Sequence, residues 1–320
     1  MHFWNKSATS YCIIAKKVVH LHAIFMTTRC QYIEPHDKWR LVRYSSIFSR
    51  HIADNILSND FEFLKDLIRD YDVRQIGNRI ITYKDYLSYI FRYLTCNYRN
   101  EYIVKNALLN KIIKDYGTSH TIALNEFSVG NSIADVVLFN GNSRAYEIKT
   151  EYDSAKRLNT QLTDYTEIFQ FCYLVVHEKH YEKYRKEINS NVGIVAYSLN
   201  KGRICFEEKK PAIENIHINP HLLIRCLRTE EYKKIVKSYY GVLPTEMNAF
   251  NAFNICEELI TNIPEAELHQ LFIAAIKGRK NNMKYLSKYE PYLRQLCLSM
   301  HIMPKDYDIL NSRLLTTINI

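Results

Sequence analysis

Hydrophobic positions change their spacing twice along the chain. In the first and last parts they recur every three or four residues, as in residues 61–68 and 86–94, which is typical of amphipathic helices. Between these parts they form short runs bounded by glycine and asparagine, which is typical of strands. We therefore expect a mostly helical N-terminal region (1–97), an α/β core (98–210) and a helical C-terminal region (211–320).

The core carries an ordered series of predicted elements. A helix over residues 101–116 should end at Gly117, because glycine is favoured just after a helix. The elements expected after it are strands at 121–129, 132–140 and 143–150, a helix at 154–169, a strand at 171–176, a helix at 181–188 and a strand at 193–199. Glycine-asparagine pairs at 130–131 and 141–142 are hairpin turns, so the first three strands should be antiparallel neighbours.

The flanking regions show helices and no local chemistry. The expected C-terminal helices cover residues 221–240, 251–260, 265–277 and 288–300. In the N-terminal region the acidic residues are predicted to lie on a solvated helix surface; they are Asp54, Asp60, Asp66, Asp70 and Asp72.

Three charged residues lie within two adjacent apolar strands. Asp135 should share a strand face with Ile133 and Val137, because side chains alternate along a strand. Glu147 and Lys149 share a face of the next strand, and the two-residue turn lets Asp135 lie beside them. An acidic pair in an apolar setting is costly unless a cation neutralises it, and hard oxygen ligands suit Mg²⁺ or Mn²⁺. A metal ion with a neighbouring ammonium group is suited to phosphodiester hydrolysis. The alternative interpretation is that Asp135 is a surface residue and that Glu147 and Lys149 form a local ion pair on exposed strands.

Residues 98–200 resemble the PD-(D/E)XK, or restriction-endonuclease-like, nuclease superfamily. The resemblance rests on Ile133-Ala134-Asp135 followed by Glu147-Ile148-Lys149-Thr150, with Ala134 in place of the proline in the superfamily's name. The next helix carries Gln161-Leu162-Thr163-Asp164-Tyr165, which is similar to the Q-x-x-x-Y motif of the RecB-type branch. The whole chain also resembles a bacterial family of this superfamily without a settled function.

The resemblance implies a divalent-metal nuclease with a mixed central sheet flanked by helices. Asp135, Glu147 and the Ile148 carbonyl would hold the metal, Lys149 would position or activate water, and Gln161 and Tyr165 would orient the substrate.

Four further residues around this set have two interpretations each. Glu101 shares a helix face with core residues, and the first helix of related nucleases often supplies such a glutamate to the metal, yet it is also a first-turn acid favoured by the helix dipole. Glu126, on the first predicted strand, is likewise either a further acidic residue of the site or an ordinary charged residue of the strand. Lys156 and Arg157 could contact backbone phosphates or be solvated.

Composition narrows the class of protein. Hydrophobic residues make up 47% of the 320-residue chain and charged residues 24%, which is typical of a globular protein. The net charge is +9; the basic excess lies in the flanks, while residues 101–200 are slightly acidic, as expected for a polyanion-binding protein with an acidic site. Uncharged apolar stretches are shorter than the roughly 20 residues of a membrane helix.

The N-terminus and the cysteines predict a cytoplasmic protein. Lys16 and Lys17 interrupt the N-terminal apolar patch, so we expect no secretory signal, and Met26 is an alternative start. The eight cysteines occur singly, with no C-x-x-C pair, which is typical of reduced thiols and gives no support to a zinc ribbon.

Three functions fit these features. The first is a cytoplasmic, Mg²⁺-dependent nuclease acting on nucleic acid, DNA rather than RNA, with room for a protein partner or a homodimer. The second is a non-catalytic module on the same fold that binds nucleic acid or protein. The third is a helical interaction or regulatory protein in which the core is a scaffold.

Overall fold

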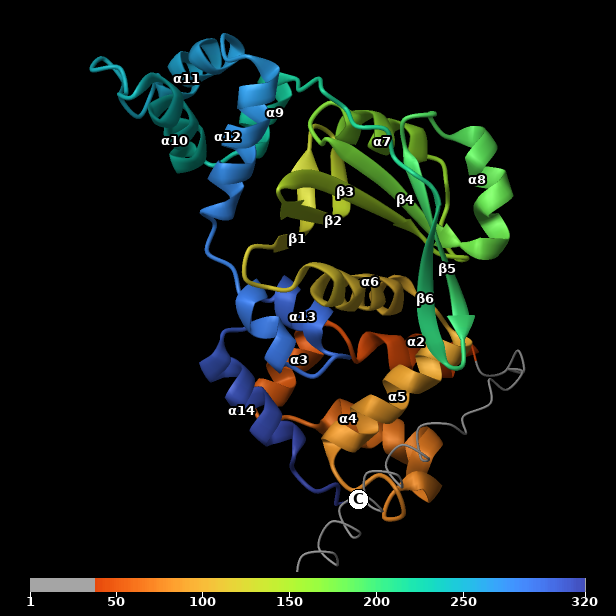
Figure 1. Ribbon diagram of the computed structural model, residues 1–320. Coiled ribbons are helices and arrows are strands. Elements are labelled where there is room, and N and C mark those ends of the chain that lie inside the picture. Colours follow the sequence, from red (N-terminus) through yellow and green to blue (C-terminus); the bar gives the residue numbers. More distant parts are fainter. Residues whose placement is uncertain (1–37, 320) are drawn as a thin grey trace, which may run out of the picture.

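A six-stranded mixed sheet, with its strands in chain order, lies at the centre of the computed structural model, which describes residues 38–319 (Figure 1). The strands are β1 (Ile122–Val129), β2 (Ser132–Asn140), β3 (Asn142–Lys149), β4 (Phe171–His177), β5 (Gly193–Asn200) and β6 (Arg203–Lys210). Strands β3, β4 and β5 are parallel, and the other neighbours are antiparallel. The predicted α/β class is therefore confirmed. The alternative start at Met26 lies outside the described residues.

Strand β6 is an element that the sequence analysis missed. It pairs antiparallel with β5 through a tight turn in which Lys201 and Gly202 have φ of 48° and 75°. Two consecutive residues with positive φ form the kind of turn that joins hairpin strands. None of its eight residues, Arg-Ile-Cys-Phe-Glu-Glu-Lys-Lys, is fully buried, because β6 is an edge strand.

Helices cover both faces of the sheet. One face packs on α6 (Glu101–Tyr116), whose predicted bounds are confirmed, and the other packs on α7 (Leu158–Thr166), which joins β3 to β4. The remaining helices are α2 (Lys38–Ser46), α3 (Arg50–Leu57), α4 (Glu62–Leu67), α5 (Tyr83–Asn97), α8 (Tyr181–Glu187), α9 (Pro220–Cys226), α10 (Thr229–Tyr240), α11 (Ala252–Thr261), α12 (Glu265–Lys277), α13 (Arg294–Ser299) and α14 (Pro304–Leu314).

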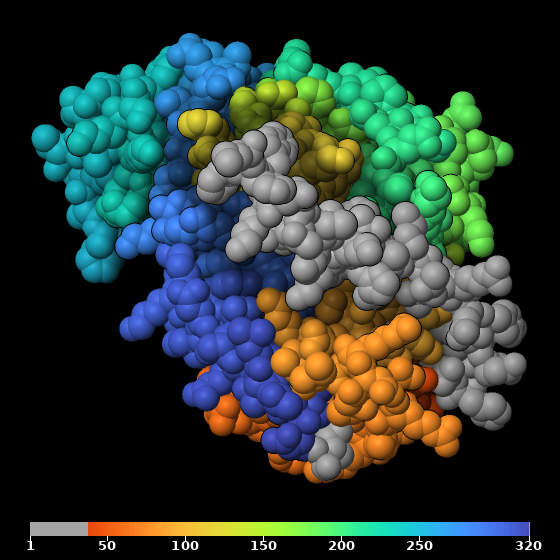
Figure 2. All heavy atoms as spheres, turned by 60° about the horizontal axis from the view of Figure 1, so that its bottom comes forward, coloured from red at the N-terminus to blue at the C-terminus, as the bar shows by residue number. Residues whose placement is uncertain are grey.

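The C-terminal helices divide between the two faces. Helices α9 to α12 pack into the hydrophobic core on the α7 side of the sheet. Helices α13 and α14 pack into the core on the opposite side, together with α6 and the N-terminal helices. The last described residues pair with the segment before α5, since Ile318 N donates to the Ile81 carbonyl oxygen at 2.8 Å. In Figure 2 the orange N-terminal helices and the blue C-terminal end form one continuous surface.

Two of the expected C-terminal helices are wrong in extent. The helix expected over 221–240 is two helices, because Leu227 and Arg228 are extended and Glu231 caps the start of α10 by accepting from Arg228 N. The helix expected over 288–300 covers only Arg294–Ser299. Pro291 disfavours a helical conformation at the residue before it, which accounts for the late start.

Asp72 was expected on a solvated surface and is instead buried, with a side chain that has no exposed area. Arg40 Nη2 lies 2.9 Å from its Oδ1, and the hydroxyls of Tyr44, Tyr86 and Tyr89 donate to its two oxygens. A buried carboxylate is tolerated when it is paired and fully hydrogen-bonded. This cluster joins α2 to α5 and the turn that contains Asp72.

No helix among residues 38–319 is long and apolar enough to span a bilayer.

Candidate functional site

The site begins where strands β1 and β2 interrupt their alternation. Ala134 packs in the core on the α7 side and Val136 in the core on the α6 side, although they are two residues apart. Glu126, opposite this point on β1, has a left-handed φ of 53°. Asp135 therefore does not share a regular face with Ile133 and Val137 as expected; Ile133 is 54% exposed and Val137 is buried.

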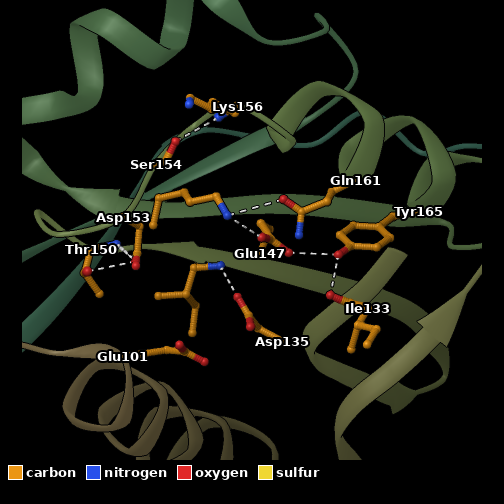
Figure 3. A network of polar contacts seen from close by, with 12 residues as sticks. Glu101, Ile133, Asp135, Glu147, Thr150, Asp153, Ser154, Lys156, Gln161 and Tyr165 are labelled. Atoms are coloured by element: carbon orange, nitrogen blue, oxygen red, sulfur yellow. Dashed lines mark hydrogen bonds and ion pairs between the residues drawn. The ribbon is translucent and has the colours of Figure 1, made fainter. Parts of the chain in front are cut away.

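Asp135 lies at the point where β2 stops pairing with β3. The last pair in the ladder is Val136 with Tyr146, and beyond it the Asp135 Oδ2 accepts a hydrogen bond of 2.7 Å from the Ile148 amide. Its Oδ1 lies 3.0 Å from Lys105 Nζ on α6. The carboxylate thus links β2 to the β3 backbone and, through Lys105, to α6; Figure 3 shows Asp135 near Glu147 and above Glu101 of that helix.

Glu147 is the centre of a second group of contacts, on the α7 side. Its side chain is 2% exposed, and Lys149 Nζ lies 2.7 Å from its Oε1. Lys149 Nζ also donates to Gln161 Oε1 at 3.3 Å. Tyr165 places its hydroxyl 2.8 Å from Glu147 Oε2 and 2.7 Å from the Ile133 carbonyl oxygen, as Figure 3 shows. Gln161 and Tyr165 are one turn apart on α7, so the helix presents both to the strand.

The two carboxylates are electrostatically coupled. Burial raises the pKa of Asp135, and Lys105 and the Ile148 amide only partly offset it. Burial also raises the pKa of Glu147, and the Asp135 charge raises it further, against the opposing effect of Lys149 and Tyr165. The site therefore holds negative charge at a free-energy cost, which is the condition under which a bound cation is stabilising.

Lys105 is the site residue that the sequence analysis missed. It lies on α6 with a side chain 8% exposed, between Asp135 and Glu101, and forms ion pairs with both. Burial disfavours its charge, but Asp135 and Glu101 outweigh that effect and raise its pKa. The sequence carried a signal, because residues four apart on a helix are neighbours and Glu101 was already a candidate.

The other candidates lie around this centre. Glu101 is on α6 with a side chain 53% exposed, and its ion pair is with Lys105. Ile148 contributes its amide to Asp135, while its side chain is buried. Lys156 and Arg157 are exposed at the start of α7, and Glu126 is exposed on β1.

Asp135 and Glu147 are the residues that could hold a divalent ion. They offer hard oxygen donors from neighbouring strands, and the Asp135 side chain is 18% exposed, so water could complete the coordination shell. Within residues 38–319 no three His, Cys, Asp or Glu side chains gather as a metal cage. A metal here would therefore depend on two carboxylates with backbone or water oxygens, a donor set that fits Mg²⁺ and Mn²⁺.

Fold and site together define an α/β protein in which two adjacent strands present an acidic pair with lysine counter-ions. The family model described as bacteriophage P4 protein cII matches residues 95–311, so the chain belongs to this family. Protein cII of Enterobacteria phage P4 is 26% identical over 178 residues, which cover 55% of this chain and 66% of that protein. The chain thus spans just under two thirds of that relative's length. No solved structure matches the chain.

The matched range begins just before α6 and contains every residue of the site. Neither matching description names an activity, and the resemblance to the PD-(D/E)XK superfamily therefore stays a prediction.

Replacing Glu147 with Gln should stabilise the metal-free protein at neutral pH. The raised pKa means that the folded state holds this proton at higher pH than the unfolded state does, so stability falls as the pH rises through the raised value. Glu147→Gln removes that loss, with an expected gain on the order of 1 kcal/mol.

Urea unfolding with EDTA at several pH values measures this difference. The gain should shrink as the pH falls below the ordinary glutamate pKa, where the wild-type side chain is also protonated. An equally large gain at acid pH would contradict the electrostatic explanation.

Proposed function

We propose that this protein is a divalent-metal-dependent nuclease that hydrolyses phosphodiester bonds, in DNA rather than RNA. The observation that carries the proposal is that Asp135 and the Glu147–Lys149 ion pair come from adjacent strands and lie close enough for the two carboxylates to interact electrostatically, with Gln161 and Tyr165 of α7 bonded to the ion pair. The choice of DNA rests on the resemblance to restriction-endonuclease-like enzymes.

Each residue has a distinct role in this proposal. Asp135 and Glu147 would hold one Mg²⁺ or Mn²⁺, which would polarise the phosphate and lower the pKa of water. Lys149 is then placed to hold an attacking water or a phosphate oxygen and to stabilise negative charge as it develops. Gln161 fixes the Lys149 ammonium group, and Tyr165 fixes the Glu147 carboxylate and excludes water from its inner oxygen.

The surroundings suit a polyanion. Lys156 and Arg157 are exposed at the end of the segment that joins β3 to α7, where they could contact backbone phosphates. The net charge of +9 favours a negatively charged partner such as nucleic acid. All six described cysteines are free, and we place the protein in the cytoplasm on that ground.

A non-catalytic module that binds nucleic acid or protein is the second candidate. One observation favours it: each of the four oxygens of Asp135 and Glu147 already accepts from a protein donor, so the carboxylates are satisfied without a metal. In this alternative the lysine–carboxylate pairs are structural, and binding would use the exposed basic residues.

Metal binding and cleavage assays distinguish the two candidates. As a nuclease, the purified protein should cleave single- or double-stranded DNA with Mg²⁺ or Mn²⁺, stop cleaving when EDTA is added, and prefer DNA to RNA of the same sequence. It should also bind Mn²⁺ in a manner that depends on Asp135. Salt-sensitive DNA binding with neither Mn²⁺ binding nor cleavage would establish the non-catalytic module instead.

A further inference from the structure

Lys105 is a buried cation that the proposed reaction does not use. Its side chain is 8% exposed, which is unusual for a lysine and is tolerated only when the charge is matched. Two carboxylates match it: Asp135 Oδ1 lies 3.0 Å from its Nζ, and Glu101, one helical turn earlier, forms the second ion pair.

The position of this ammonium group is informative. Glu101 and Asp135 come from different elements, α6 and β2, and Lys105 bridges them. In nucleases with two metal ions, the ions lie close together and share carboxylate ligands. A second metal ion on the α6 side would need Glu101 and Asp135 as ligands. The Lys105 ammonium group already pairs with both of these carboxylates.

The charge of the site leads to the same conclusion. Three carboxylates, Glu101, Asp135 and Glu147, face two ammonium groups, Lys105 and Lys149, which leaves one unbalanced negative charge. One bound divalent ion changes the net charge of these five groups from −1 to +1. A second ion would add two further positive charges to a largely buried site that keeps both lysines, which is strongly unfavourable.

We propose that Lys105 takes the place of a second metal ion, so that the site binds one divalent ion, through Asp135 and Glu147, and Glu101 is not a ligand. The inference rests on the proposed function because it requires that function's metal site. It also assigns Glu101 the role of holding the Lys105 ammonium group, in place of the metal-binding role suggested by the resemblance.

Counting bound Mn²⁺ tests the inference without any cleavage assay. Electron paramagnetic resonance of free Mn²⁺ gives the stoichiometry for the full chain and its variants. Wild type should bind one ion, and Lys105→Met should bind two, because the freed Glu101 and Asp135 then accept a cation. Lys111→Met is the matched control, since Lys111 forms an exposed pair with Asp115 on the same helix; it should bind one ion.

Glu101→Gln provides a second test that does not depend on Lys105→Met folding. Its carboxylate is half exposed, so the change should leave the fold intact, one ion bound, and the Mn²⁺ affinity close to that of wild type. The double variant Lys105→Met/Glu101→Gln should return to one ion.

The outcomes separate the two proposals. One ion in wild type and one in a folded Lys105→Met would overturn the role of Lys105 and leave the metal site standing. A loss of affinity of more than about a hundredfold in a folded Glu101→Gln would do the same, because it exceeds the roughly 10- to 100-fold loss expected for a residue that only supports the ligands and would make Glu101 a ligand. No Mn²⁺ bound by wild type or by any variant would overturn the proposed function itself, and this inference with it.

Discussion

Asp135→Asn is expected to slow DNA cleavage by about a thousandfold or more, because it removes one of the two charged metal ligands. The fold should survive, since the new amide oxygen can still accept from the Ile148 amide and Lys105 keeps its pair with Glu101. Single-turnover cleavage at saturating Mg²⁺ measures the effect, with a thermal melt to confirm folding.

Asp164→Asn is the matched control. This carboxylate is on α7 and contacts Ser132, near the site but outside the proposed machinery, so its variant should cleave at close to the wild-type rate. Full cleavage by Asp135→Asn would place the active site elsewhere or leave the enzyme proposal without support.

Asp72→Ala should lower the free energy of unfolding by about 3 kcal/mol or more, because it leaves a buried arginine contact and three tyrosine hydroxyls without their shared acceptor. Urea unfolding followed by circular dichroism measures the change. No effect on metal binding is expected in the protein that remains folded, since the cluster lies in the N-terminal helices.

The neighbouring Asp70→Ala serves as the control for that experiment. Asp70 lies in the same helical turn, and its ion pair with Arg43 is exposed, so its loss should change stability by less than about 0.5 kcal/mol. Equal effects of the two variants would contradict the importance assigned to burial.

The parts of the fold that the sequence predicts are those set by local patterns. The β1–β2–β3 hairpins follow from glycine-asparagine turns, and α6 follows from its apolar spacing and Gly117. Strand β6 escaped prediction because an edge strand buries little, so its charged sequence lacks the apolar run that marks β4. The break between α9 and α10 escaped because no proline or glycine marks it.

The site was predictable where its members are close in sequence. Asp135 lies on one strand of a hairpin and Glu147 and Lys149 on the other, so the hairpin is enough to bring them near one another. The break in alternation at Asp135 was not predictable, because it depends on the left-handed conformation of Glu126 across the ladder. Asp72 was misjudged for a related reason: Arg40 and Tyr44 lie about thirty residues away, and only tertiary packing supplies them.

The layer beneath α6 is built from both ends of the described chain. Asn106 on α6 donates to the Pro291 carbonyl oxygen at 2.9 Å and accepts from the Gln295 amide at 3.0 Å. During synthesis the ribosome releases the sheet long before these residues emerge. Lys105 precedes Asn106, so the helix that carries it gains this support only after residues 291–295 have emerged. A nascent chain that ends before residue 291 would thus hold Lys105 on an incompletely anchored helix next to the acidic pair, which makes assembly of the site depend on residues 291–295.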